Sequence, residues 1–346
     1  MNQKVSHALR IGITLLIIAM LVMFATKVNW HSIWASIRTT SRSMLLAAAL
    51  VNIASIAVKG IRWWVFLRPI GAKSLPLALR ATFAGAGLNN VLVANGGEAA
   101  RVVFVSRSAH IASAKVVATL ALERLFELVG YVVLLSLAAS LLDLPPQLEK
   151  AKYFAVPLLV VMGALLVWLL RRPDVIEVVG GPKPATWQGR LKRYGARFIG
   201  TISTVSSGPR FIAALLLSVL AWALQVATYQ MTARAAHFPM TTVATIAALL
   251  LVNLGFLFRL TPGNVGIFQT AYAAAAVAFG LDRNQAIAVA LLIQAQQILP
   301  VTLLGVALAP EFILKARKRR AADAAGELPS QSREARATDT PSEPSA

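Results

Sequence analysis

Six apolar stretches of this chain are each long enough to cross a lipid bilayer, and they limit what the chain can fold into. They are Ile11–Val28, Met44–Phe66, Val116–Leu142, Tyr153–Leu170, Phe211–Ala233 and Ala286–Ala309. A helix needs about 20 apolar residues to span a hydrocarbon core of about 30 Å. Charged residues make up 14% of the chain, whereas soluble domains carry about 25%. The sequence therefore predicts an all-α, polytopic integral membrane helix bundle.

Two weaker apolar segments interrupt this series of spans. They cover Leu75–Ala94 and Thr242–Leu281, and both are rich in glycine and asparagine. At membrane depth every backbone N–H and C=O needs an internal partner, so broken helices are tolerated only inside protein or beside a wet cavity. We interpret both segments as re-entrant or discontinuous hairpins, although the second is long enough for two short crossings.

The positive charges predict the orientation of the chain. With a cytoplasmic N-terminus, 25 of the 34 Lys and Arg residues lie in the inner segments 1–10, 59–115, 171–210 and 311–346, and 7 lie outside. This is the positive-inside pattern, so both termini should be cytoplasmic. The same bias explains the net charge of +20 without a nucleic-acid partner. Three spans and one broken segment in each half make an inverted repeat possible.

The chain divides into a membrane domain and a tail. Residues 1–312 form the membrane domain, in which 171–210 is a cytoplasmic loop with an amphipathic helix from Trp187. Residues 313–346 are first basic and then rich in Ala, Ser, Pro and Glu, which predicts disorder. With no cysteine in the chain, cysteine metal sites and disulfides are excluded. We expect no metal and no cofactor.

The acidic residues of the first half are clustered around the first broken segment. Glu98, Glu123 and Glu127 are the only acidic residues before Asp143. Glu123 and Glu127 share a helix face, and Arg124 can pair with Glu127 at i, i+3. Two interpretations stay open. The charges form either a collar at the cytoplasmic interface or a buried network that faces a cavity.

The first break, NGGEAAR, has the composition of an anion site. Asn95 can cap a helix that begins near Gly96, and Gly97 allows another group to approach the backbone closely. Unpaired N–H groups at such a helix end attract anions. Arg101 lies one turn farther on, where it can reach a phosphate or pair with Glu98.

The second break, RLTPGNVG, resembles a helix start of a different kind. Thr261 is at the position of an N-cap, and Pro262 follows it in the first helical turn. Gly263 and Gly266 keep the loop narrow, and Arg259 lies just before it. Because both breaks lie in apolar surroundings, we expect the two to line one site.

These motifs resemble a known family. The runs NGGEAARVVFVSR, ERLFE and TPGNVGIFQ are similar to those of the lysylphosphatidylglycerol synthase transmembrane-region family, or flippase-like domain family, over most of residues 8–312. The matching positions are Gly97, Glu98, Arg101, Glu123, Arg124, Pro262, Gly263 and Gly266. One departure is Gln269, where family members often carry glutamate.

The resemblance implies an integral membrane protein without catalytic residues. Fused members of the family move aminoacylated phospholipid between leaflets and also carry a soluble aminoacyl-transferase domain, which we do not expect here. We expect a multi-pass lipid translocase of the inner membrane, which moves an anionic or modified phospholipid or a lipid-linked headgroup. The expected partners are membrane lipids with anionic headgroups. The expected protein partner is a further copy of this chain, in a homo-oligomer, or an envelope-biosynthesis protein.

Two other functions remain open from the sequence. A membrane enzyme acting on lipid-linked sugars typically needs acidic residues in an outer loop, and the loop 27–43 has none. The four histidines are scattered and unpaired in the sequence, so an enzyme is the less favoured alternative. A non-transporting subunit or regulator of envelope lipid or glycan biosynthesis would use the glycines only for close helix packing.

Overall fold

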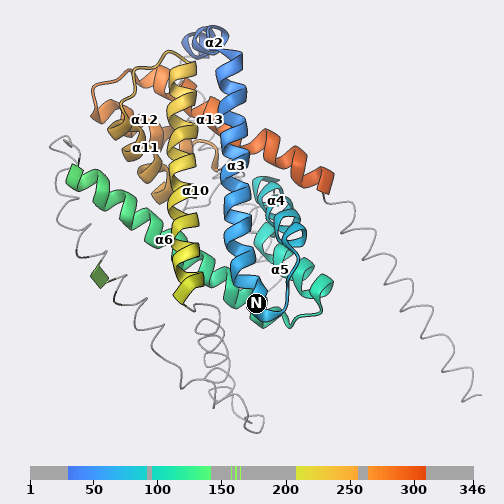
Figure 1. Cartoon of the computed structure of the whole chain (residues 1–346). Helices are drawn as coiled ribbons and strands as arrows, with labels where there is room; N and C mark the ends of the chain where they lie inside the picture. The colour runs from blue at the N-terminus through green and yellow to red at the C-terminus, as the bar shows by residue number, and fades with distance from the viewer. Residues whose placement is uncertain are drawn as a thin grey trace, which may run out of the picture.

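The computed structural model describes residues 30–91, 96–141, 208–255 and 264–308, with four isolated helical positions between 157 and 164. Every regular element in these ranges is a helix, as predicted (Figure 1). Outside the described residues lie the predicted span Ile11–Val28, the predicted cytoplasmic loop from residue 171 to 207, and the tail 313–346. Tyr153–Leu170 is described only at the four isolated positions.

In the described part of the chain, three helices are long and apolar enough to cross a membrane. They are α3 (Arg42–Leu67), α10 (Gly208–Ala235) and α13 (Arg283–Leu308), and they coincide with three of the predicted spans. A fourth helix, α6 (Ser113–Leu141), has 29 residues, but its N-terminal half carries the charged run around Glu123. The structure thus places a helix at each predicted span that it fully describes.

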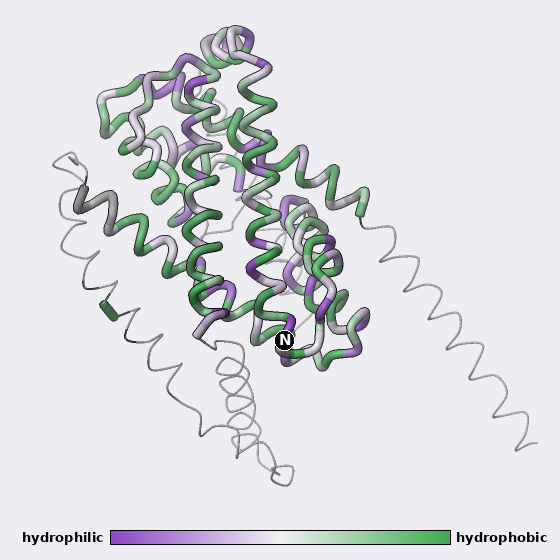
Figure 2. The backbone as a smooth tube through the Cα atoms, viewed as in Figure 1, coloured by the Kyte–Doolittle hydropathy of each residue, from purple (hydrophilic) through white to green (hydrophobic). Residues whose placement is uncertain are grey.

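The outer faces of these long helices are apolar, as lipid-facing surfaces should be. Figure 2 shows hydrophobic residues along the outer sides of α3 and α10. Large side chains there are well exposed, among them Leu46, Leu50, Leu216 and Leu303, the last at 71%. Such an extended exposed apolar surface is unusual in a soluble monomer. The bundle therefore has the surface of a membrane protein.

The first weak apolar segment folds as one helix, which pairs with the helix that follows it, and the second contains a pair of short helices. The first pair is α4 (Leu75–Val91) with α5 (Gly96–Ala109), and the second is α11 (Thr242–Gly255) with α12 (Ile267–Ala278). The two helices of each pair pack against each other. With 14 and 12 residues, α11 and α12 are only about 21 and 18 Å long. Over the described residues neither is long enough to cross about 30 Å of hydrocarbon alone. We call each of these two packed pairs of helices a hairpin.

Helices α3 and α10 run antiparallel at the centre of the bundle (Figure 1). At one end, the Ser41 N–H donates to the Ala235 carbonyl at 2.9 Å. Farther along, the Ser55 hydroxyl donates to the Ala221 carbonyl at 3.1 Å. The short helix α2 (Trp30–Arg38) precedes α3 at the first end, and the 3₁₀ turn η1 (Arg68–Ile70) follows α3 at the other.

The remaining contacts come in matching pairs. Helix α3 packs on α4 and α6, and α10 packs in the same way on α11 and α13. Across the centre, α4 packs on α13 and α11 packs on α6. The elements in 42–141 therefore have counterparts, in the same chain order, in 208–308.

Helix α13 is fixed to its neighbours at two special positions. At Gly305 the backbone approaches α4 so closely that a Cβ would lie 2.9 Å from the Phe83 carbonyl oxygen and 3.1 Å from Gly87 Cα. Pro300 lies inside α13 and has no N–H for the carbonyl four residues earlier. That carbonyl, of Gln296, instead accepts a hydrogen bond from the Asn52 side chain of α3 at 3.3 Å.

Candidate functional site

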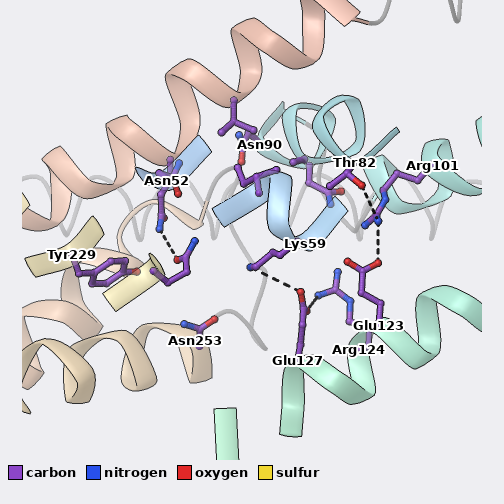
Figure 3. A pocket seen from close by; sticks show the side chains of 16 residues that line it. Asn52, Lys59, Thr82, Asn90, Arg101, Glu123, Arg124, Glu127, Tyr229 and Asn253 are labelled. Carbon is purple, nitrogen blue, oxygen red and sulfur yellow. Dashed lines mark hydrogen bonds and ion pairs between the residues drawn. The ribbon is translucent and has the colours of Figure 1, made fainter. Parts of the chain in front are cut away.

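A polar cavity of about 390 Å³ lies inside the bundle, between the two central helices and the ends of both hairpins (Figure 3). Seven helices contribute to its wall, which is mostly polar. The lining residues are Asn52, Ile56, Lys59, Thr82, Ala86, Asn89, Asn90, Arg101, Glu123, Arg124, Glu127, Gln225, Tyr229, Asn253, Gln297 and Val301. Asn89 and Asn253 each lie near the C-terminal end of the first helix of a hairpin, so both of these helix ends adjoin this one cavity.

The first break is held by a contact between two glycines. Helix α5 begins at Gly96, as predicted, although the predicted cap Asn95 lies outside the described residues. The Gly97 N–H donates instead to the Asn89 side chain of α4 at 2.8 Å. A Cβ on Gly97 would overlap the carbonyl oxygen of Gly85. The predicted close approach at Gly97 is confirmed, whereas Asn89 escaped notice in the sequence.

Arg101 pairs with Glu123 and not with Glu98, which was one of the two partners that the sequence left open for it. Arg101 is 7% exposed, and its Nη2 donates to Glu123 at 2.9 Å and to the Thr82 hydroxyl at 3.4 Å. The side chain of Arg101 turns inward over Gly85. Only a glycine leaves room for it at position 85, because a Cβ there would overlap the Arg101 side chain. Its guanidinium also lies 4.0 Å from the centre of the Trp63 ring.

Glu123 also lies close to a second arginine, Arg62 of α3. The Arg62 side chain is fully buried. Nη2 of Arg62 is 3.7 Å from Glu123 Oε1 and 3.3 Å from Glu127 Oε1. Nη1 donates to the Ser218 hydroxyl at 2.9 Å. The sequence places Arg62 near the end of an apolar stretch, where a lysine or arginine usually marks the membrane interface. Its burial depends on carboxylates about 60 residues later in the chain, so local pattern reasoning missed it.

A second, less buried group of charges adjoins Arg62 and Glu123. Arg124 donates to Glu127 at 2.6 Å, which confirms the predicted i, i+3 pair, and it also pairs with Glu98. The Lys59 ammonium lies 4.0 Å from Glu127. The side chain of Arg124 is 49% exposed. The acidic cluster is therefore a network with a buried half at Glu123 and a more open half at Arg124.

The network has unused capacity for an anion. Among the described residues, four cations, Lys59, Arg62, Arg101 and Arg124, face three carboxylates, Glu98, Glu123 and Glu127, which leaves one positive charge in excess. Nε of Arg101 is buried and makes no hydrogen bond within the described residues. Buried donors of this kind are normally satisfied. The excess positive charge therefore favours an anion in the cavity.

The second break lies only partly within the described residues. Arg259, Pro262 and Gly263 lie outside the described residues. The predicted cap at Thr261 lies there too, and α12 begins at Ile267. Before it, the backbone is left-handed at Asn264 and Gly266, with φ of 59° and 89°, a conformation that favours glycine.

Gln269 holds this second turn and is fully buried. Its side-chain oxygen accepts from the Gly266 N–H at 2.7 Å, and its NH₂ group donates to Gln294 of α13. An amide suits this position because both its donor and its acceptor are used. Gln269 is not among the residues that line the cavity. Among the described residues of this hairpin, Asn253 lines the cavity, and sequence analysis did not single it out.

Comparison with known proteins agrees with this architecture. The sequence model of the family described as "Lysylphosphatidylglycerol synthase TM region" matches residues 9–305. A UPF0104 membrane protein of Pyrococcus horikoshii is 30% identical to this chain over 139 residues. That match covers 37% of this chain and 38% of the relative, well under two thirds of its length.

Proposed function

Because the chain belongs to the lysylphosphatidylglycerol synthase transmembrane-region family, we propose that it is a lipid translocase of the inner membrane. It moves the headgroup of an anionic or modified phospholipid, or a lipid-linked headgroup, between leaflets and changes no bond of the lipid. The observation that carries this proposal is the polar, positively biased cavity inside a bundle with apolar outer faces.

The charged network supplies what a phosphate needs at membrane depth. Without a polar route, a charged headgroup pays a large cost to enter hydrocarbon. Arg101, Lys59 and Arg124 line the cavity and can donate charge-assisted hydrogen bonds to phosphate oxygens. Glu123 and Glu127 hold these cations in place when no lipid is bound. The acyl chains stay outside, against the exposed apolar faces of the long helices.

The matching helix contacts support an inverted repeat as the architecture for this route. Helices α3, α4, α5 and α6 correspond in contacts and order to α10, α11, α12 and α13, and the central pair is antiparallel. Transporters built this way place their binding site between the two repeats, beside broken helices. We infer six full spans and two cytoplasmic termini. The two hairpins then enter the membrane from opposite sides.

This orientation predicts the labelling of two single cysteines in the cysteine-free chain. Thr39 and Ser74 are exposed and lie beyond opposite ends of α3, a helix of 26 residues that is about 39 Å long. In intact cells, a membrane-impermeant thiol reagent should label Thr39→Cys and leave Ser74→Cys unlabelled until the membrane is opened. The reverse pattern would invert the proposed topology, and labelling of both would contradict the spanning of α3.

The role of Arg101 in translocation can be tested with reconstituted protein. In vesicles with a leaflet-labelled anionic phospholipid, Arg101→Met should slow transfer about tenfold or more, because one charge-assisted hydrogen bond contributes about 1.5–3 kcal/mol. Arg283→Met, at an exposed arginine at the start of α13, is the matched control and should transfer lipid at the unmodified rate. Thermal unfolding must show that both variants are folded. Equal rates for the two variants would rule out the proposed route.

A further inference from the structure

The two ends of the cavity differ in charge. Among the residues that the structure describes, every charged side chain that lines it belongs to 59–127, on α3, α5 and α6. The opposite end is formed by uncharged polar side chains, mostly from the second half of the chain. We name this group the amide end; its members are Asn52, Gln225, Tyr229, Asn253 and Gln297. Figure 3 shows Asn52, Tyr229 and Asn253 gathered on one side, Arg101 and Glu123 on the other, and Lys59 between them.

The two ends are separated by about the length of a lipid headgroup. Asn52 and Lys59 are both on α3 and both line the cavity. Seven residues of helix are two turns, so the two side chains share a face and start about 10 Å apart. A phosphate at the charged end therefore leaves room for several more non-hydrogen atoms toward the amide end.

The amide end suits hydroxyl groups. Gln297 donates to Gln225 at 3.4 Å, and Gln225 donates to the Ser55 hydroxyl at 3.3 Å. Asn253 donates to the Leu249 carbonyl of its own helix at 2.8 Å. Each amide has two N–H donors and an oxygen with two lone pairs, so these contacts use part of its capacity. A hydroxyl both donates and accepts hydrogen bonds. It can therefore pair with an unused N–H of an amide or with an unused lone pair of its oxygen.

The same end is unsuited to an ammonium group. The described lining residues at the amide end include no carboxylate, so a cationic headgroup would find no charge partner there. The carboxylates at the other end are already shared among four cations. A lipid that carries a positive aminoacyl group would add to the existing excess of positive charge.

We propose that the amide end is a subsite for a neutral, hydroxyl-rich headgroup, next to the anion subsite at Arg101. The preferred lipid is then a phosphodiester lipid whose headgroup is a sugar or another polyol, rather than an aminoacylated one. This assignment rests on the proposed translocation function, because it names the class of headgroup that the same cavity takes.

Binding of three lipids to the purified full chain tests this assignment. The probes are phosphatidylinositol, phosphatidylethanol and lysylphosphatidylglycerol with identical short acyl chains, and dissociation constants are measured in detergent. The first two carry the same phosphodiester charge and differ in their hydroxyls. Phosphatidylinositol should bind about tenfold more tightly than phosphatidylethanol, and lysylphosphatidylglycerol should bind least tightly.

Two variants and a control locate the preference. Gln297→Met and Asn253→Leu, on different helices, should each reduce the preference for phosphatidylinositol severalfold and leave phosphatidylethanol binding unchanged. Gln285→Met, at an exposed glutamine on α13, should keep the full preference. Equal binding of phosphatidylinositol and phosphatidylethanol by the unmodified chain overturns the proposal, and so does an unchanged preference in both amide variants.

Transport is measured separately on the same lipids. If phosphatidylinositol binds with the expected preference and yet no lipid crosses the bilayer, the translocation function fails while the headgroup assignment stands. If lipids cross but lysylphosphatidylglycerol binds and crosses as well as phosphatidylinositol, translocation stands and the headgroup assignment is wrong.

Discussion

Replacing Glu123 with glutamine is expected to destabilise the folded chain by about 3–5 kcal/mol, the usual cost of removing one partner from a buried ion pair. Glu123 accepts from Arg101 at 2.9 Å and lies 3.7 Å from Arg62, and both arginines are buried. Glutamine has nearly the same shape but no charge. Two guanidinium groups then remain in the interior with less compensation. Thermal unfolding of the purified protein in detergent measures the loss.

Glu98→Gln is the matched control, because it also removes one carboxylate from the network. Glu98 pairs with Arg124, whose side chain is 49% exposed, and pairs of that kind contribute about 0–1 kcal/mol. The double variant Arg101→Met with Glu123→Gln should recover part of the stability, because it no longer leaves Arg101 unpaired. If Glu98→Gln and Glu123→Gln unfold at the same temperature, the distinction between a buried and an open half of the network is wrong.

Replacing Gly97 with alanine should also have a large effect, because it forces two backbones apart. The new Cβ would overlap the Gly85 carbonyl oxygen and lie 2.7 Å from the Asn89 side-chain oxygen. The asparagine can rotate, but the carbonyl moves only if α4 and α5 separate. We expect a loss of about 3 kcal/mol, at the upper end for an overpacked site. Lipid transfer should fall with it, because Arg101 lies one turn beyond Gly97 on α5.

Gly208→Ala provides the comparison for this variant. A Cβ on Gly208 meets no atom within 4 Å, and alanine favours a helix more than glycine does. Its unfolding temperature should equal or slightly exceed that of the unmodified protein. A Gly97→Ala protein that is as stable as Gly208→Ala would show that the hairpin tolerates a wider spacing than the structure has.

The long helices could be predicted from sequence because burial in lipid leaves a direct mark on composition. The stretch Met44–Phe66 differs from α3 by two residues at its start and one at its end. The hairpins were harder, because their length alone does not separate two crossings from one re-entrant pair. The described residues show short helices that pack on each other, and only tertiary contacts could show that packing.

The site could be predicted only where its partners are neighbours in the sequence. Arg124 and Glu127 pair as their spacing indicates. Arg101 does not pair with Glu98, three residues away, because Gly85 opens a path toward Glu123 on α6. The uncharged amides of the cavity left no signal beyond the asparagine content of the two weak apolar segments. Single asparagines and glutamines in apolar runs become conspicuous only when several helices bring them together.

The proline of α13 gives the bundle a mechanical property. Pro300 divides this helix into two arms, and the backbone hydrogen bond that it lacks is replaced by one from Asn52 on α3. The shorter arm carries Gly305, whose backbone touches α4 near Gly87. The shorter arm is therefore fixed directly to the hairpin that carries Arg101. The break between the two arms lies at the wall of the cavity, one residue from Val301.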